Sequence, residues 1–173
     1  QTLYAAMMAR PFVKMNGAGN DFVVVNALET PFAPTADQAR AISDRMTGEG
    51  CDQLIALEPS NTADAFMRVW NADGGQVETC GNALRCVGWI LMQSSGKDRV
   101  VIDTLAGTTT ARQEQDGRVT IDMGAPRLDW SQIPLDEAMD TRGIELQVGP
   151  IDDPVLHTPG AVSMGNPHVV FFM

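Results

Sequence analysis

The sequence is short of basic residues, of cysteines and of long apolar runs, and each shortage excludes a class of protein. Its 173 residues include 12 Lys and Arg against 22 Asp and Glu, which gives a formal net charge of −10. Such a surface repels phosphate groups, so we expect no nucleic-acid partner. No apolar stretch approaches the ~20 residues that a membrane helix requires, so we expect no membrane partner either.

Three cysteines are present: Cys51, Cys80 and Cys86. A disulfide framework would use an even and denser set, so we expect a reducing, cytoplasmic location. The N-terminal letters QTLYAAMMARPF carry no basic residue before their apolar part, so they are not expected to be a secretion signal. We interpret residues 1–7 as an upstream or cloning remnant, with Met7 or Met8 as the natural start.

The hydrophobic pattern predicts an α+β fold, in which a largely antiparallel sheet wraps around one central helix. Strands are expected in FVKM and DFVVVNA, on either side of the glycine-rich turn NGAGN, and in DQLIALEP and AFMRVWNAD. Further strands are expected in RVVIDTLAG, TTTARQEQ and RVTIDM, with a hairpin turn at Asp116–Gly117.

Two helices are expected among these strands. The first begins with a capping box, Thr35 followed by Gln38, and ends at Gly48 and Gly50. The second covers Gly81–Met92 and is apolar on nearly every side, so other structure should enclose it. The apolar face of the first helix should hold Ala39, Ile42 and Met46.

The composition changes after about residue 123, where the chain becomes rich in turns. We predict an N-terminal domain over residues 1–123 and the opening segment of an incomplete second domain of the same kind over residues 124–173. The last letters, VVFFM, form an apolar strand with no following partner in the sequence. An unfinished apolar strand favours association, so a homodimer is left open.

Cys80 stands at the start of the second predicted helix, before a Gly-Asn pair. The first N–H groups of a helix lack intrahelical partners and favour negative charge, so they could stabilise a thiolate or hold a carboxylate. A buried, inert cysteine is the commoner role, and both interpretations stay open here. Cys86 is expected to be a small core residue, and Cys51 is undecided.

The other motifs do not by themselves predict a metal or nucleotide site. The cysteines lack CxxC spacing and a histidine at ligand spacing, so no metal is expected. Phe22 occupies the third glycine position of a GxGxxG loop, which excludes a dinucleotide site at NGAGND. Asparagine is commonly structural in turns, and a lone histidine commonly packs. These alternatives apply to Asn20, Asn71, Asn166 and His168.

Four segments together resemble the diaminopimelate epimerases. They are KMNGAGNDFVVVNA, GCDQLIALEP, NADGGQVETCGNALRC and GAVSMGNPHVVFF, in the order of that family's N-terminal half, from about Phe12 to Phe172. The Gly-Asn pair after Cys80 favours this family over the related proline racemases and hydroxyproline epimerases. The resemblance implies conversion of LL- to meso-diaminopimelate, a small-molecule substrate of lysine and peptidoglycan-precursor biosynthesis, with no cofactor.

The resemblance also implies a role for each matching residue. Two cysteines on opposite faces of the α-carbon remove and return a proton, and Cys80 matches one of them. His168 matches the imidazole that partners this cysteine, and Gly81 and Asn82 match backbone donors to the reacting carboxylate. Without pyridoxal phosphate, such aligned N–H groups are the available means to stabilise the carbanion. Side chains that match substrate-binding positions are Asn20, Gln53, Asn71 and Asn166.

The sequence departs from the family pattern at the second base. Neither Cys51 nor Cys86 matches the opposing cysteine, so the 173 residues are expected to carry half of a catalytic centre and to be inactive alone. Two rival readings remain. The chain could be a related isomerase of the proline racemase type, or a non-catalytic binding or structural module with Cys80 in its core.

Overall fold

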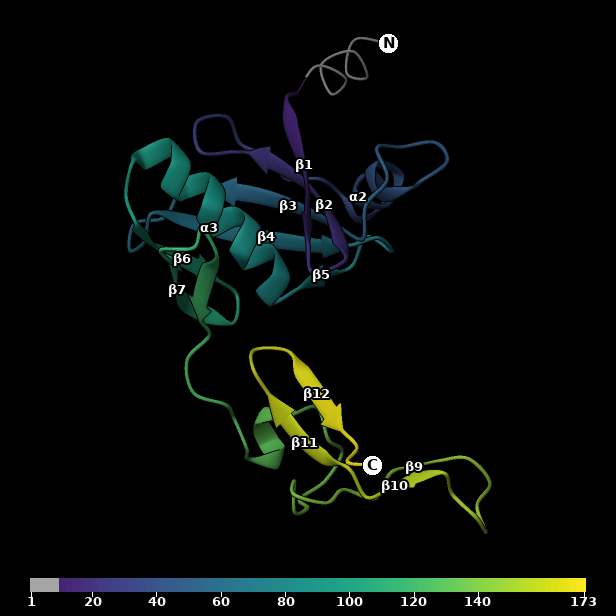
Figure 1. The fold of residues 1–173 in the computed structure, drawn as a ribbon. Coiled ribbons are helices and arrows are strands. Elements are labelled where there is room, and N and C mark those ends of the chain that lie inside the picture. The colour runs from purple at the N-terminus through teal and green to yellow at the C-terminus, as the bar shows by residue number, and fades with distance from the viewer. Residues whose placement is uncertain (1–9) are drawn as a thin grey trace. The chain divides into compact units, whose positions relative to one another are not determined.

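The computed structural model describes residues 10–173, and these residues divide into two compact units, 10–122 and 123–173 (Figure 1). The interpretation of residues 1–7 as a remnant lies outside the described residues. The assignment of residues 1–123 and 124–173 as domains of an enzyme stays a prediction.

The first unit is built on one mixed sheet of eight strands. These are β1 (Phe12–Gly17), β2 (Asn20–Asn26), β3 (Gln53–Glu58), β4 (Ala65–Asn71), β5 (Gln76–Val77), β6 (Arg99–Thr104), β7 (Gly107–Gln113) and β8 (Val119–Asp122). Their order is β1-β2-β3-β4-β6-β7-β8, with β5 beside β4. Neighbours are antiparallel except β2–β3 and β4–β6, which are parallel.

Within residues 10–122, two helices pack on this sheet. Helix α2 (Ala36–Ser43) contacts β3 and β4, whereas α3 (Gly81–Ser95) contacts β1 and β2 as well as β6, β7 and β8. The sheet therefore curls around α3 from both sides (Figure 1). The predicted α+β fold, with a sheet around a central helix, is confirmed.

The two helices lie on opposite faces of the sheet, because side chains alternate along a strand. Val23 and Leu54 pack in one cluster with Ala39 of α2. The ring of Phe22 points the other way and lies close to Gly17, as does the Cys86 sulfur of α3. Strands β2 and β3 are buried on both faces, which explains their continuous apolar letters.

Helix α2 confirms the predicted capping box. The Thr35 hydroxyl accepts the N–H of Gln38, and the Gln38 side chain accepts the N–H of Thr35. The predicted end was wrong, however, because the helix stops at Ser43 and Met46 is 91% exposed. The Asp44 carboxylate turns the chain there by accepting the N–H groups of Met46 and Thr47.

Helix α3 begins where the sequence predicted, and it continues to Ser95 before Gly96 takes a left-handed conformation. The expectation that other structure encloses the whole helix was wrong for the unit described here. Arg85 is exposed and Trp89 is 43% exposed, because the curled sheet covers only part of the helix surface.

The predicted hairpin at Asp116–Gly117 and the predicted glycine-rich turn between the first two strands are both confirmed. Gly17 pairs with Asn20 across a two-residue loop that joins β1 to β2. The β7–β8 connection turns at Asp116–Gly117, where Gly117 has a φ of +82° that favours glycine.

The second unit is small and rich in turns, as expected. Its strands are β9 (Gln147–Val148), β10 (Leu156–His157), β11 (Gly160–Ser163) and β12 (Pro167–Val170), with one short 3-10 helix at Trp130–Gln132. A separate apolar cluster contains Ile133, Ile144 and Ala161. The apolar terminal strand predicted in VVFFM is present only in part, because β12 ends at Val170 and the last three residues are not in a strand. Strand β12 pairs antiparallel with β11. Across residues 10–173, no helix combines the length and apolar character needed to cross a membrane.

Candidate active site

The candidate site is the N-terminal end of α3. Cys80 is the N-cap residue, with φ −146° and ψ 114°, and its side chain makes no capping hydrogen bond. The first intrahelical bond runs from the Leu84 N–H to the Cys80 carbonyl, at 2.9 Å. The N–H groups of Gly81 and Asn82 form the positive end of the helix dipole. The first turn holds no acidic residue that would neutralise this partial charge.

The β1–β2 loop packs directly against this first turn. A Cβ atom built on Gly17 would lie 2.9 Å from the Asn82 carbonyl oxygen and 3.0 Å from the Cys86 sulfur. Only a residue without a side chain allows the strand end and the helix to approach so closely. Glycine at this position therefore brings the loop, and Asn20 with it, to the helix start.

A chain of side-chain hydrogen bonds connects the loop to the helix. Asn82 donates through Nδ2 to Asn20 Oδ1 at 2.8 Å, and Asn20 Nδ2 faces Asp52 Oδ2 at 3.5 Å. The Asn82 Oδ1 atom accepts from the Arg85 guanidinium. Two of the predicted site residues, Asn20 and Asn82, are thus in direct contact.

The sheet supplies two more predicted site residues. Gln53 at the start of β3 pairs with Asn71 at the end of β4 and with Phe22 of β2. The shared register places all three on the face that α3 covers. Gln53 Nε2 donates to Asn71 Oδ1 at 2.9 Å, while Gln53 Oε1 is buried without a hydrogen-bond partner among the described residues. A buried acceptor without a donor is costly, so this end of the sheet suits a ligand that brings a donor.

Arg45 and two carboxylates fix the same end of the sheet. Arg45 donates to Asp21 at 3.0 Å and to Asp52 at 2.8 Å. The N–H of Asp21, then Arg45 and Asn20, lower the pKa of the Asp52 carboxyl. The Asn16 amide and Arg45 likewise lower the pKa of Asp21, so both side chains are ionised at neutral pH.

The other two cysteines lie inside the protein. Cys86 is 5% exposed, and burial raises the pKa of its thiol. Cys51 is 2% exposed, with its sulfur 3.5 Å from the Ser43 hydroxyl. Cys80 is only partly buried. The prediction that Cys86 is a core residue is confirmed, and Cys51, which the sequence left undecided, is a core residue as well.

Asn166 and His168 lie in the second unit. His168 Nε2 is 3.0 Å from Asn166 Oδ1, and both residues are exposed. The structure thus brings these two predicted site residues together at the start of β12. Their contribution to the site at Cys80 stays a prediction.

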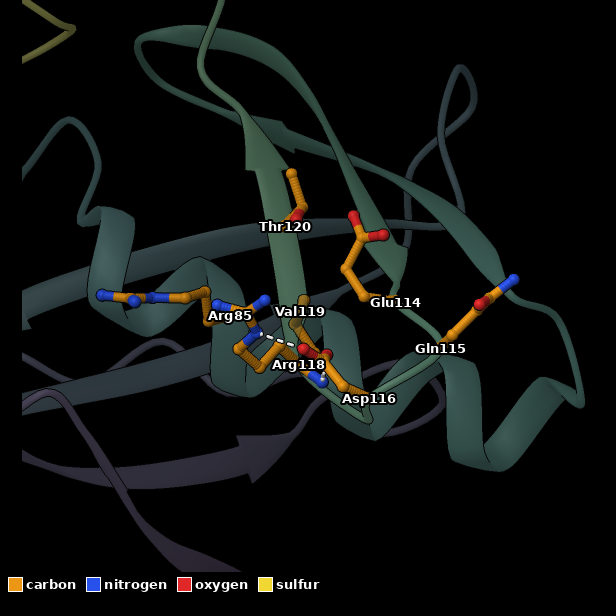
Figure 2. Close-up of a pocket in the computed structure, with 7 residues that line it drawn as sticks. All are labelled: Arg85, Glu114, Gln115, Asp116, Arg118, Val119 and Thr120. Carbon is orange, nitrogen blue, oxygen red and sulfur yellow. Dashed lines mark hydrogen bonds and ion pairs between the residues drawn. The ribbon is translucent and has the colours of Figure 1, made fainter.

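A surface pocket lies between α3 and the β7–β8 hairpin. Figure 2 shows its lining residues, and none of them was predicted from the sequence as a site residue. Its two arginines also have partners, since Arg118 pairs with Asp116 at 2.7 Å and Arg85 with Asn82. The lining residues are Arg85, Glu114, Gln115, Asp116, Arg118, Val119 and Thr120.

Sequence reasoning missed the residues that hold the site together. Asp52 contacts Asn20, Gly17 packs against Asn82, and Arg45 holds Asp52, but none of the three was singled out. The letters GCDQ offered one signal, because Asp52 directly precedes Gln53. Gly17 stands in the recognised NGAGN turn, but only the tertiary contact with α3 shows why it must be glycine.

Solved structures with a similar fold include two that are described as epimerases. The hydroxyproline epimerase of Agrobacterium vitis matches with a TM-score of 0.62 and 17% identity, over 91% of this chain and 50% of that one. A predicted epimerase from Pseudomonas aeruginosa matches with a TM-score of 0.59 and 14% identity, over 94% of this chain and 59% of that one. At such identities the similarity shows the fold alone, and the fold is the one found in this class of epimerases.

Sequence similarity then gives the family. Residues 12–128 match the family profile described as diaminopimelate epimerase. The diaminopimelate epimerases of Caulobacter sp. (strain K31) and Phenylobacterium zucineum (strain HLK1) are 57% and 58% identical to this chain, over 96% and 98% of its length. The chain belongs to the diaminopimelate epimerase family. It spans about 60% of the length of these two relatives.

Proposed function

We propose that this chain supplies one of the two bases in the cofactor-independent epimerisation of LL- to meso-diaminopimelate. The observation that carries the proposal is the uncapped first turn of α3, which starts at the partly exposed Cys80 and faces Asn20. Membership of the family supports the substrate.

In this proposal the start of α3 binds the carboxylate at the reacting carbon. The N–H groups of Gly81 and Asn82 donate to its oxygens, and the positive helix end favours the charge. The Cys80 thiolate takes the α-hydrogen as a proton, so that a C–H bond breaks and an S–H bond forms. Negative charge then develops on the carbon and its carboxylate, where the N–H groups stabilise it more strongly than in the ground state.

Inversion needs a proton donor on the opposite face of the α-carbon. Cys51 and Cys86 are buried in the core of the first unit, so neither presents a thiol to that face. We infer that the second thiol comes from outside these 173 residues, and that the chain alone produces no meso product. His168 would partner Cys80, and Asn71 and Asn166 would bind the distal amino-acid end of the substrate together with Gln53, whose Oε1 lacks a donor.

A chimera tests this function. Residues 10–173 replace the corresponding segment of the Caulobacter sp. (strain K31) relative, which is 57% identical. LL-Diaminopimelate is then incubated with the chimera in deuterated water. We expect meso product with deuterium at the inverted carbon, and loss of that product in the Cys80→Ala chimera. A folded chimera that forms no product would contradict the function, and so would one in which Cys80→Ala keeps full activity.

Two controls sharpen the result. Cys51→Ala removes a thiol that lies in the core, so the folded variant should keep epimerase activity. Trans-4-hydroxy-L-proline tests the alternative hypothesis that the chain is part of a proline racemase-type isomerase. It should not be epimerised, because it carries no second amino-acid end for Asn71 to bind.

We also infer a cytoplasmic location and a place in lysine and peptidoglycan-precursor biosynthesis. All three cysteines are free, as a reducing compartment would keep them. The pathway follows from the proposed substrate.

A further inference from the structure

We propose that Asp52 is a positioning residue, which sets the orientation of the Asn20 amide and, through Asn20, the orientation of Asn82 beside Cys80. The inference rests on the function proposed above. Asp52 does not contact the reacting atoms in this account. It acts through a row of hydrogen-bonded side chains, Asp52, Asn20 and Asn82, in which each side chain fixes the orientation of the next.

The orientation of this row is set first by the ionised Asp52 carboxylate, which can only accept hydrogen bonds. Asp52 Oδ2 faces Asn20 at 3.5 Å, so the NH₂ end of that amide turns toward it. The reverse orientation would set the amide carbonyl oxygen against a negative charge. Because Asp52 holds the NH₂ end, the carbonyl end of Asn20 points to α3 and accepts from Asn82 at 2.8 Å.

The far end of the row has a fixed direction as well. The Arg85 guanidinium has only donors, and it binds the Oδ1 atom of Asn82. Asn82 must therefore present its NH₂ group to Asn20. An acceptor-only group at one end and a donor-only group at the other leave one consistent arrangement of the two amides.

Asp52 is well fixed for this task. Its Oδ2 accepts the backbone N–H of Asp21 at 2.9 Å, and its Oδ1 accepts from Arg45 at 2.8 Å. The Asp52 N–H donates to the Asp21 carbonyl at 2.9 Å, so backbone bonds also hold the residue. These contacts fix the carboxylate at the junction between β2 and β3.

The consequence for the site concerns the first turn of α3. Asn82 supplies one of the N–H groups proposed to bind the substrate carboxylate, and its side chain fastens that turn to the β1–β2 loop. If the Asn20 amide rotates, its NH₂ group meets the NH₂ group of Asn82 and the bond is lost. The first turn of α3 then loses its side-chain hydrogen bond to Asn20, and its N–H groups bind a carboxylate more weakly.

The test uses the 173-residue chain and the variant Asp52→Asn, which keeps the shape but replaces an obligatory acceptor. Two quantities are measured at pH 7. One is the hydrogen-exchange rate of the Asn20 and Asn82 side-chain amides by NMR. The other is the ratio of the alkylation rates of Cys80 by iodoacetate, which carries a carboxylate, and by neutral iodoacetamide. We expect the Asn82 amide to exchange at least threefold faster and the ratio to fall at least threefold.

Two control variants separate positioning from general loosening. Asp64 resembles Asp52, since it accepts a backbone N–H from Val101 at 2.8 Å and pairs with Lys97, but it does not contact the site. Asp64→Asn should leave both quantities unchanged. Arg45→Gln breaks both ion pairs of the cluster but keeps the Asp52 carboxylate, so its effect should be under half that of Asp52→Asn on a logarithmic scale.

Three outcomes would overturn the proposal: a change of less than threefold in Asp52→Asn, a measurable change in Asp64→Asn, or an Arg45→Gln effect of half or more of the Asp52→Asn effect on a logarithmic scale. Failure of the proposed function has a different signature. In that case the unsubstituted chain shows no preference for iodoacetate relative to free cysteine, and the amide exchange rates alone decide the role of Asp52.

Discussion

Replacing Gly17 with alanine should destabilise the first unit and disturb the start of α3. An added Cβ would lie 2.9 Å from the Asn82 carbonyl oxygen, although ordinary van der Waals contact begins at 3.4 Å. The Cys86 sulfur would be 3.0 Å away on another side, so the methyl group has no free direction. Either the loop or the first turn of α3 must move by several tenths of an ångström.

The expected cost follows from two opposing effects. Forcing a methyl group into a packed contact costs about 1–3 kcal/mol. Alanine restricts the unfolded chain more than glycine does, which returns about 0.4–1 kcal/mol when the native backbone suits alanine. Gly17 has no positive φ, so this gain applies. Taking the middle of each range, the net loss in the free energy of unfolding is about 1.3 kcal/mol.

Urea unfolding, followed by tryptophan fluorescence and circular dichroism, measures this loss. With a denaturant slope of about 2 kcal/mol per molar, the urea midpoint should fall by roughly 0.6 M. Gly160→Ala is the matched control, because Gly160 is also in a strand without a positive φ and its added Cβ would come no closer than 3.8 Å to another atom. Equal stability of Gly17→Ala and the unsubstituted chain, or an equal loss in Gly160→Ala, would refute the packing argument.

Three further predictions concern other contacts. Gly88→Ala should lower the free energy of unfolding by about 1–3 kcal/mol, because its Cβ would lie 2.4 Å from that of Ala111, and adding Ala111→Gly should restore most of the loss in urea unfolding. The Arg142 side chain lowers the pKa of Asp140 to about 2. The stability that this ion pair adds to the folded chain is therefore complete above the unfolded pKa near 3.8, and it is lost as pH falls toward 2. A carboxyl NMR titration of Asp140 should have its midpoint at this pKa, and Arg142→Ala should move the midpoint to a higher pH. A midpoint that does not move would contradict the ion pair. The chain should self-associate through exposed β12, and light scattering should show that Val170→Lys is a monomer. Equal association of both proteins would show that β12 is not the contact surface.

Local signals in the sequence were sufficient to predict most of the first unit. The capping box at Thr35, the hairpin at Asp116–Gly117 and the helix starting after Cys80 depend on neighbours in the sequence, and the structure has all three. The end of α2 was misjudged because the Asp44 carboxylate competes with the helix for backbone N–H groups, which hydrophobic periodicity does not register.

The contacts that build the site were beyond local reasoning. Asn20 and Asn82 are 62 residues apart, and Asn20 and Asp52 are 32 apart, so their hydrogen bonds exist only once β1, β2, β3 and α3 have assembled. The sequence nominated Asn20 and Asn82 through a family resemblance. It gave no physical reason to pair them, and none to choose Asp52.

The central claim is that Cys80 is a reactive thiol at a carboxylate-binding helix start. Site-resolved alkylation of the native 173-residue chain by iodoacetamide tests it most directly, with and without LL-diaminopimelate. We predict that Cys80 is modified well before the buried Cys51 and Cys86, and that diaminopimelate slows its modification. A Cys80 thiol that stays unmodified until the chain is denatured, or one that diaminopimelate does not protect, would contradict the account.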